Sequence, residues 1–391
     1  MGRATPLIPP PQRHIALDDV RTLAISSQLG RGSMATVYRG VIDGGFGVRR
    51  AVALKLFDVV ASDEHESVME TLASAARDAA CVRHPNVVSL EDFGLLSPIQ
   101  PFVVLELVEG RTLAQLLDAY EASRQRVPLD IALFVGAEIA EGLAGARLAT
   151  SPDGMRLGIV HGELSPTDVL LSWNGEVKVG DFGIAAAARA ASTVRSVGAL
   201  ARRVRALAPE VARGAFGDAR SDVFSLGVML REMMLGPRFP PSVTDSQAIV
   251  LAREGTVVES LFEPQLAPEL RAVLDRAVER DPARRFPHAG ALAYDLRRVA
   301  LAMGVGDGRS FLRHAMPNVF RADGWDDEPT GELIDGRPSR SSRPSAPSRE
   351  SDRFARLREP PESGTLLRGS KWGSDDEEDG IIEDLEAVED D

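Results

Sequence analysis

Short alternating runs of apolar and polar residues fill positions 23–110 of the chain, and longer helical patterns follow them. Five of the short runs are bounded by glycines and polar turns and have the length and composition of β-strands. They are Leu23–Leu29, Ala35–Ile42, Arg50–Phe57, Val87–Phe93 and Phe102–Leu107. Between the third and the fourth, Glu64–Val82 predicts a helix, because no Pro or Gly interrupts its helix-forming composition.

Between Thr112 and Met303 the pattern becomes mainly helical. Ile131–Leu148 and Asp222–Leu235 place apolar residues three and four positions apart, as a buried helix face requires. A small β-rich lobe that ends near residue 108, followed by a larger α-helical lobe, is a bilobal α+β fold. We expect this domain over residues 21–305 and a helical extension over residues 306–325.

The two ends differ from the middle in composition. Residues 1–20 contain four prolines between positions 6 and 11 and predict a flexible leader. Residues 326–391 predict a disordered tail, since the Arg/Ser/Pro-rich stretch 336–353 cannot build a core. A short apolar-acidic piece, Ile381–Val388, leaves open the alternative that the tail contains a partner-binding segment.

Charge is concentrated at the C-terminal end. The net charge is -13, but residues 375–391 hold eleven Asp or Glu and no Lys or Arg, so the rest carries only -2. A block of like charges repels itself and stays solvated, which argues against nucleic acid as a partner of that end.

The remaining composition is that of an ordinary globular protein, with 44% hydrophobic and 26% charged residues. A single cysteine, Cys81, excludes an internal disulfide, and no Cys/His cluster has zinc spacing. We expect no membrane span, since no apolar run approaches the ~18 to 20 residues required, and no signal peptide begins the chain. A cytoplasmic location is the resulting expectation.

Two motifs in the β-rich part suggest a phosphate site. Gly30 and Gly32 lie in a turn between two strands, where backbone N–H groups can approach phosphate oxygens closely. Lys55 stands in the middle of an apolar strand, Ala51–Leu56, where an unpaired ammonium is costly to bury. Alone, the glycines are typical of a hairpin, and the lysine is typical of a side chain that reaches the surface. The spacing between the two motifs makes them together a far more specific sign of a phosphate site than either motif alone.

Acidic motifs follow in the helical part. His161-Gly162-Glu163-Leu164-Ser165-Pro166-Thr167-Asp168 is followed thirteen residues later by Asp181-Phe182-Gly183. A carboxylate at this second motif would hold Mg²⁺ against phosphates. Three further motifs come after them: Ala208–Glu210, Arg220–Gly227 and Asp281–Phe286.

This ordered series resembles the bacterial eukaryotic-type serine/threonine protein kinases over about Leu23 to Met303. The resemblance implies ATP and Mg²⁺ as cofactors and a protein substrate or regulatory protein as partner. Lys55 would pair the nucleotide phosphates, and Asp168 and Asp181 would bind the metal. The adenine would lie between Val37, Ala53 and Leu170, and its edge would contact the segment that links the lobes, with Glu106 and Val108. Without the other motifs, this segment would be interpreted as a strand that ends in a Gly turn. The resemblance also implies a Glu210–Arg285 pair and a bracing role for Asp222.

The chain departs from the family pattern where the chemistry takes place. H-R-D is replaced by H-G-E, so the catalytic base would be Glu163, and Asp168 stands in place of Asn. In the family, a Glu of the small lobe's helix normally pairs with the strand lysine. Counting along the sequence puts Ala75 at that position, so Lys55 would lack its usual partner and be free to move. Ser165 replaces the catalytic-loop lysine, and Arg203 is placed to offset that loss, as in a related bacterial pattern.

Two functions therefore stay open. The first is an ATP-binding protein with weakened or lost phosphoryl transfer and a regulatory role in signalling. The second is an active ATP-dependent kinase that uses Glu163 as base.

Overall fold

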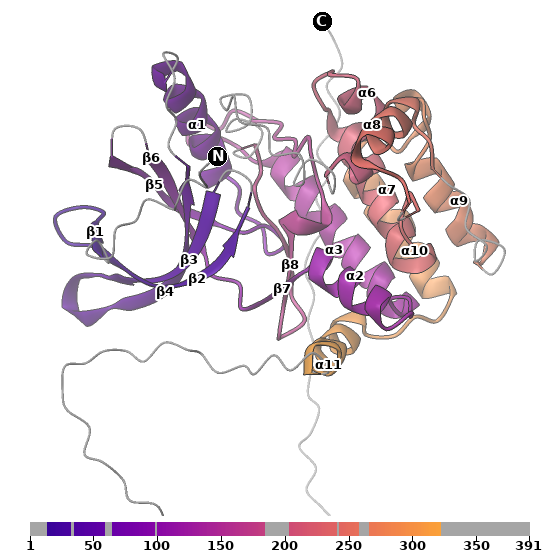
Figure 1. Cartoon of the computed structure of the whole chain (residues 1–391), viewed down its shortest axis with the longest axis horizontal. Helices are drawn as coiled ribbons and strands as arrows, with labels where there is room; N and C mark the ends of the chain where they lie inside the picture. Colours follow the sequence, from indigo (N-terminus) through magenta and orange to yellow (C-terminus); the bar gives the residue numbers. More distant parts are fainter. Residues whose placement is uncertain are drawn as a thin grey trace, which may run out of the picture. The chain divides into compact units, whose positions relative to one another are not determined.

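The computed structural model describes residues 14–32, 35–58, 65–97, 100–183, 203–240, 242–257 and 266–321. Within this part of the chain a β-rich lobe precedes a helical lobe (Figure 1), as the hydrophobic pattern predicts. The expected tail, residues 326–391, lies outside the described residues.

The small lobe is built on a six-stranded antiparallel sheet with the order β1-β2-β3-β4-β6-β5. Its strands are β1 (His14–Ala16), β2 (Thr22–Arg31), β3 (Ala35–Asp43), β4 (Arg49–Phe57), β5 (Leu90–Ser97) and β6 (Gln100–Glu106). All five predicted strands are present, although β5 begins three residues later than expected. The residues before it, Val87 and Val88, instead bond Val179 of the other lobe.

The first strand differs from the expected leader of residues 1–20. His14–Ala16 pairs with β2, and Ile15 is buried in the core of the sheet. A tight turn makes this possible, since the Asp18 carboxylate accepts hydrogen bonds from the backbone N–H groups of Val20 and Arg21. The prolines that suggested a flexible leader all precede this strand.

Alternation along β4 divides the sheet into two faces. Val52, Leu54 and Leu56 are buried on one face with the core of the outer strands. Ala53, Lys55 and Phe57 point to the other face, which is covered by helix α1 (His65–Ala80). The register places Lys55 between Val37 of β3 and Val103 of β6, so its side chain lies on the α1 face.

A second, three-stranded sheet follows the link between the lobes. It has the order β7-β8-β9, with β7 (Gly110–Thr112), β8 (Val169–Ser172) and β9 (Val177–Val179). Helix α2 (Leu113–Ala122) begins directly after β7, where Thr112 and Gln115 form a capping box. Pro166–Asp168 directly precedes β8, and Asp181 follows β9 by two residues. The paired strands β8 and β9 therefore bring these two segments to the same end of the small sheet.

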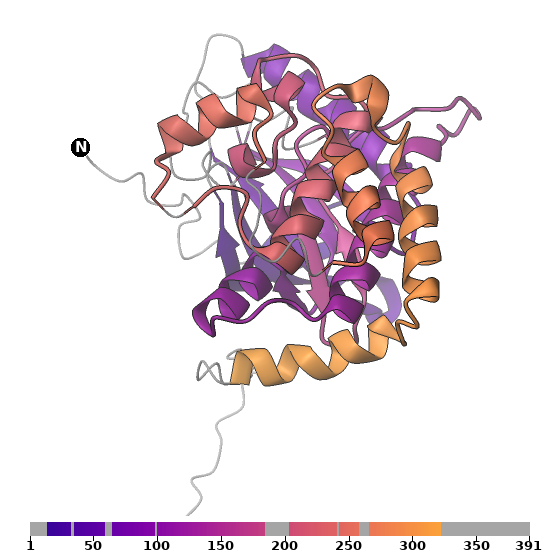
Figure 2. The same cartoon turned by 90° about the vertical axis from the view of Figure 1, so that its right-hand side faces the viewer.

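Helix α3 (Leu129–Leu148) is the centre of the large lobe. Eleven of its residues are buried, and it packs against α7, α10, α11 and β9. The other helices are α6 (Pro209–Ala212), α7 (Ala219–Leu235), α8 (Asp245–Glu254), α9 (Pro268–Ala277), α10 (Ala289–Ala302) and α11 (Gly308–Arg321). Figure 2 shows α11, in orange, crossing the base of the lobe. There Phe320 meets Trp173 edge to face, and the Arg111 guanidinium lies over both rings.

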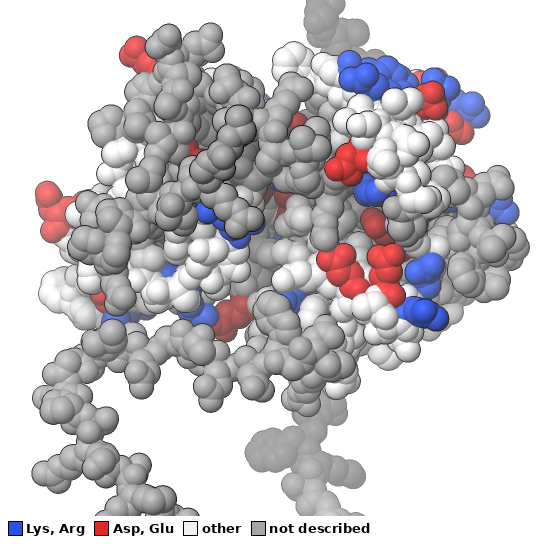
Figure 3. Space-filling view, in the orientation of Figure 1, with Lys and Arg blue, Asp and Glu red and all other residues white. Residues whose placement is uncertain are grey.

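Arginines close two helix ends at the corner of α6 and α8. The Arg213 Nε donates to the Arg253 carbonyl at 2.9 Å, and the Arg253 Nε donates to the Ala212 carbonyl at 3.1 Å. Each cation therefore satisfies a carbonyl at the other helix's C-terminus, where cations are favourable. Basic side chains gather over this corner, at the upper right of Figure 3.

No helix among the described residues combines the length and apolar character that crossing a membrane requires.

Candidate active site

Lys55 and Asp181 meet where the two lobes face each other. The Lys55 Nζ donates to the Asp181 Oδ1 at 2.6 Å, and both side chains are largely buried. Burial raises the pKa of the Asp181 carboxyl, but the Lys55 ammonium outweighs it, with help from Arg203, and the pKa lies below its ordinary value. Asp181 is therefore ionised at neutral pH. The expectation that Lys55 is free to move is wrong, because Asp181 holds it.

Helix α1 offers no carboxylate to this lysine. A methyl group added at Gly183 would lie 4.0 Å from the Ala75 Cβ, so Ala75 of α1 lies close to the Asp181–Gly183 turn and offers only a methyl group there. Glu70 and Asp78 are exposed on the same helix. The prediction that Lys55 lacks its usual helix partner agrees with this placement.

The catalytic-loop backbone is braced from below by Asp222 of α7. Its two carboxylate oxygens accept hydrogen bonds from the backbone N–H groups of His161 and Gly162, at 2.9 and 2.8 Å. Burial raises the pKa of Asp222, while the His161 charge and these two N–H groups act against that rise. Gly162 itself has a φ of +80°, a conformation that favours glycine. The predicted bracing role of Asp222 is confirmed.

Three charged side chains meet on the other side of the loop. The Arg203 guanidinium lies 3.6 Å from the Glu163 Oε2 and 3.6 Å from the Asp168 Oδ1. The Asp168 side chain is 2% exposed, and its Oδ2 accepts hydrogen bonds from the backbone and the hydroxyl of Ser165. Arg203 therefore lies beside Glu163, the predicted base, and Asp168, a predicted metal ligand. This position agrees with the expectation that Arg203 offsets the lysine that Ser165 replaces.

A backbone bond joins Asp168 to the Asp181 turn. The Gly180 N–H donates to the Asp168 carbonyl at 2.8 Å, and the His161 Nε2 contacts the Gly180 carbonyl at 3.0 Å. The Phe182 ring packs against His161 with centroids 5.1 Å apart. Lys55, Asp181, Asp168 and Glu163 are thus brought together by direct contacts and by Arg203.

The residues predicted to hold the phosphates and the adenine lie in or next to β2, β3, β4 and β8 and in the segment that links the lobes. Gly30 pairs with Val37 across β2 and β3, and the Gly32 N–H donates to the Ala35 carbonyl at 2.8 Å. Ala53 lies on the Lys55 face of β4. In the large lobe, Leu170 lies half-buried in β8, and Val108 follows β6 in the linking segment.

The Glu106 side chain is part of an ion pair that the sequence analysis missed. Both its oxygens lie near the Lys178 Nζ of β9, at 2.9 and 3.0 Å. Lys178 is three residues before Asp181, so the pair ties the link between the lobes to the strand that leads into the Asp181–Gly183 turn. A lysine in a short apolar strand, Val177–Val179, was the only sequence signal for it.

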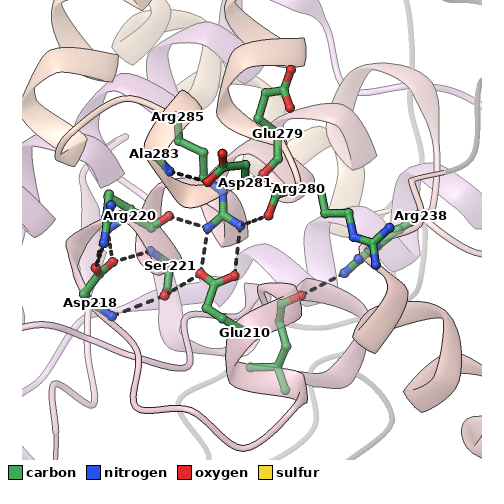
Figure 4. Close-up of polar contacts among 11 residues, drawn as sticks. Glu210, Asp218, Arg220, Ser221, Arg238, Glu279, Arg280, Asp281, Ala283 and Arg285 are labelled. Carbon is green, nitrogen blue, oxygen red and sulfur yellow. Dashed lines mark hydrogen bonds and ion pairs between the residues drawn. The ribbon is translucent and has the colours of Figure 1, made fainter.

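The predicted ion pair between α6 and the segment before α10 is intact. Arg285 donates to both carboxylate oxygens of Glu210, at 2.7 and 2.9 Å (Figure 4). The Arg285 side chain is fully buried, and the Ser221 hydroxyl also donates to Glu210. The predicted Glu210–Arg285 pair is confirmed.

A family model described as protein tyrosine and serine/threonine kinase matches residues 23–294, which span both lobes and every motif above. The chain belongs to the bacterial eukaryotic-type serine/threonine protein kinases. Kinases of this family generally use ATP with a divalent metal ion and act on proteins.

Curated relatives agree with this assignment. The chain is 32% identical over 316 residues to a probable serine/threonine-protein kinase of Streptomyces coelicolor, covering 78% of this chain and 43% of the relative. It is 31% identical over 293 residues to the serine/threonine-protein kinase PknL of Mycobacterium tuberculosis, covering 73% and 67%. It is also 32% identical over 267 residues to the tyrosine-protein kinase MasK of Myxococcus xanthus, covering 68% and 41%. The chain thus spans less than half the length of two of these relatives.

A solved structure shows the same fold. The PknI kinase domain of Mycobacterium tuberculosis aligns with a TM-score of 0.51 at 24% identity, covering 71% of this chain and 95% of that domain. At that identity the likeness concerns the kinase fold alone.

Proposed function

We propose that this kinase binds ATP with Mg²⁺, transfers phosphate weakly or not at all, and acts in the cytoplasm as a regulatory protein in signalling. The observation that carries the proposal is the Lys55–Asp181 pair. It keeps an ammonium and an ionised carboxylate together at 2.6 Å, while the α1 residue that lies near the Asp181–Gly183 turn is Ala75, which has no carboxylate. A site that retains its phosphate and metal groups and lacks a chemical one is suited to binding more than to turnover.

The residues present fit ATP and Mg²⁺. Asp168 and Asp181 offer carboxylate oxygens, the donors that Mg²⁺ prefers, and Asp168 adds a negative charge where the family has Asn. The bound metal would neutralise phosphate charge, and Lys55 would face the phosphates from the opposite lobe.

The nucleotide itself would lie between the lobes. Backbone N–H groups at Gly30 and Gly32 would approach its phosphates, and Val37, Ala53 and Leu170 would enclose the adenine. Glu106 and Val108 would meet the adenine edge through their backbone, which leaves the Glu106 side chain available for Lys178.

Weak transfer follows from the groups that would handle the substrate hydroxyl. Glu163 is one methylene longer than Asp, and a displacement of ~1 Å at the reacting centre costs ~10²-fold in rate. Its carboxylate also faces Arg203, and an ion pair favours the ionised form but restrains the side chain. Without a glutamate from α1, Lys55 is positioned by a metal ligand and not by the helix.

One observation favours the second candidate, an active kinase with Glu163 as base. Arg203 places a guanidinium beside both Glu163 and Asp168, where it would stabilise charge on a transferring phosphate in place of the missing lysine. The phosphate acceptor would then be a serine or threonine of a protein. One relative is named a tyrosine-protein kinase, so the acceptor residue has to be identified directly.

Two measurements on the full chain decide between the candidates. The first is transfer of radiolabelled phosphate from Mg-ATP to the protein itself and to a generic protein substrate, followed by identification of the phosphoamino acid. The second is thermal stabilisation by Mg-ATP, which we expect to be clear in the parent and lost in Lys55→Ala. Asp43→Asn, which removes an exposed pair with Arg49, is the matched control and should behave as the parent.

The outcomes are distinct. Stabilisation without transfer supports the binding role, and transfer that Asp181→Ala abolishes supports the active kinase. If calorimetry detects no heat with any adenine or guanine nucleotide, with Mg²⁺ or Mn²⁺ present, both candidates fail.

A further inference from the structure

Two arginines exchange hydrogen bonds between the segment that carries Arg203 and the loop after α7. The Arg205 guanidinium donates to the carbonyls of Phe239 and Val243, at 3.1 and 3.2 Å. In the opposite direction, the Arg238 Nη1 donates to the carbonyls of Arg205 and Leu207, at 3.1 and 3.0 Å. Each segment therefore satisfies carbonyls of the other.

Arg238 is the more unusual of the two. It is only 5% exposed, and its guanidinium lies over the rings of Phe224 and Phe239, with centroids 5.0 and 4.8 Å away. The Nε of Arg238, which is labelled in Figure 4, donates to the Thr256 carbonyl at 2.8 Å, and its Nη2 has no hydrogen-bond partner among the described residues. No acidic side chain of the described residues forms an ion pair with it.

A buried cation without a counter-charge is costly, and burial lowers the pKa of Arg238 to about 9. Filling space would not require a charge, because a methionine fills a similar volume without that cost. The planar guanidinium does something that a methionine cannot do: it joins three backbone carbonyls from two separate segments.

The segment it holds leads directly to the charged cluster of the active site. Residues 203–206 form one helical turn in which Val204 and Ala206 are buried, and Val204 belongs to the apolar cluster around Phe239. Arg238 bonds the carbonyls of Arg205 and Leu207, and at the start of the same turn the Arg203 guanidinium lies beside Glu163 and Asp168.

We propose that Arg238 is a positioning residue that fixes the turn 203–207 and thereby holds the Arg203 guanidinium against Asp168 and Glu163. This inference deepens the proposed function, and its metal-binding test rests on it. Arg203 and a metal ion compete for Asp168, so the strength with which Arg238 holds the turn sets how readily the metal enters.

The first test is a double-mutant cycle on Mn²⁺ affinity of the nucleotide-free full chain, measured by electron paramagnetic resonance. Arg203→Met removes a cation beside the buried Asp168 and should tighten Mn²⁺ binding at least about twofold, since even exposed charge pairs contribute up to about 1 kcal/mol. Arg238→Met should shift the affinity in the same direction, and the double variant should match Arg203→Met alone, because both changes act through one contact. Arg238→Lys should restore the parent affinity only in part, since three donors on one nitrogen cannot span the three carbonyls.

Arg231→Met is the matched control. Arg231 is a buried arginine of α7 that pairs with Asp275 at 3.3 Å, so its loss should lower stability without changing Mn²⁺ affinity. An unchanged affinity in Arg238→Met, or effects of the two arginines that multiply in the double variant, would overturn the proposal.

The second test does not depend on metal or nucleotide. Amide hydrogen exchange of residues 203–208 should be at least about tenfold faster in Arg238→Met than in Arg231→Met, while other segments respond alike. If the parent binds no Mn²⁺ at all, the proposed function fails, and the exchange rates alone decide the role of Arg238. Equal exchange rates in Arg238→Met and Arg231→Met would show that Arg238 stabilises the core in general and does not specifically hold the turn, which would overturn the proposal.

Discussion

The Lys55 ammonium pairs with the Asp181 carboxylate at 2.6 Å, so the lysine of the small lobe is held by the Asp181–Gly183 turn and not by helix α1. The pair keeps Asp181 ionised in spite of its burial. A metal ion that binds Asp181 and a phosphate that binds Lys55 would have to break this ion pair. Nucleotide and metal are therefore expected to bind together more strongly than either binds alone.

Lys55→Met tests this coupling. We expect ATP affinity to fall roughly tenfold or more, since hydrogen bonds to charged groups contribute about 1.5–3 kcal/mol. Calorimetry with Mg-ATP, with Arg49→Met as the control for losing a cation at an exposed site, measures the change. An affinity within twofold of the parent would show that Lys55 does not face the nucleotide.

The same variant should change the pH dependence of metal binding. Without the ammonium, burial of Asp181 is opposed mainly by Arg203, so its pKa rises and the carboxylate takes up a proton at a higher pH than in the parent. Mn²⁺ binding to Lys55→Met should therefore weaken as the pH falls, starting at a higher pH than in the parent. Titrations between about pH 3 and 7 cover the ordinary aspartate pKa of about 3.9 and the higher values expected in the variant. Parallel pH profiles would contradict the assignment.

Much of the fold was predictable because its signals are local. Alternation along β4 separates Leu54 from Lys55, and a glycine-free stretch before Val82 makes α1. The family resemblance carried by the motifs around His161, Asp181 and Glu210 likewise implies the contacts of Asp222 and Arg285, which the structure confirms. The Lys55–Asp181 pair was not predictable, because it depends on how the lobes face each other across 126 residues of sequence.

Restoring the two family residues should show which position limits phosphoryl transfer. In Ala75→Glu/Glu163→Asp, a carboxylate on α1 would draw Lys55 from Asp181, and the shorter base would regain its usual reach. We expect a gain of about 10²-fold in the rate of transfer, which is the effect of correcting ~1 Å at the reacting centre. The rate of radiolabelled phosphate transfer measures it, with each single variant beside the double.

A gain in Glu163→Asp alone would place the defect at the base. A gain that requires both changes would place it in the coupling between α1 and the loop. No gain in any variant would mean that the chemistry is limited elsewhere, for example by the restraint that Arg203 exerts on Glu163.

Gly162→Ala should destabilise the protein although no atom lies within 4 Å of the added methyl group. The cost comes from the backbone, since φ is +80° and the two N–H bonds to Asp222 prevent relaxation. About 1 kcal/mol is expected, the usual penalty for a left-handed alanine. Urea denaturation measures it, and Gly30→Ala, at a site with equal space and without a positive φ, is the control. Equal stabilities of the two variants would show that the loop relaxes.

Contacts that the sequence could not predict share a physical cause. Arg238 and Arg203 are ordinary arginines in the sequence, and their roles appear only when two segments thirty residues apart exchange hydrogen bonds. An arginine that bonds backbone carbonyls leaves no partner to find in the sequence, because every residue has a carbonyl.

Glu210→Gln should remove a pH-dependent part of the stability. Burial raises the pKa of Glu210, but the Arg285 and Ser221 hydrogen bonds outweigh it, and the pKa lies below its ordinary value. A carboxyl with a lowered pKa stabilises the fold fully above its unfolded pKa of about 4.3, and that contribution is lost as the pH falls through the lower folded pKa. At pH 7 the variant also leaves Arg285 buried without its counter-charge, so a loss of about 3–5 kcal/mol is expected. Urea denaturation at several pH values should show the free energies of unfolding of the parent and the variant approaching each other below about pH 4.

The exposed Asp43–Arg49 pair is the control, and Asp43→Asn should cost at most about 1 kcal/mol. A difference between parent and Glu210→Gln that stays constant from neutral to acid pH would mean that the pair contributes through shape and not through charge.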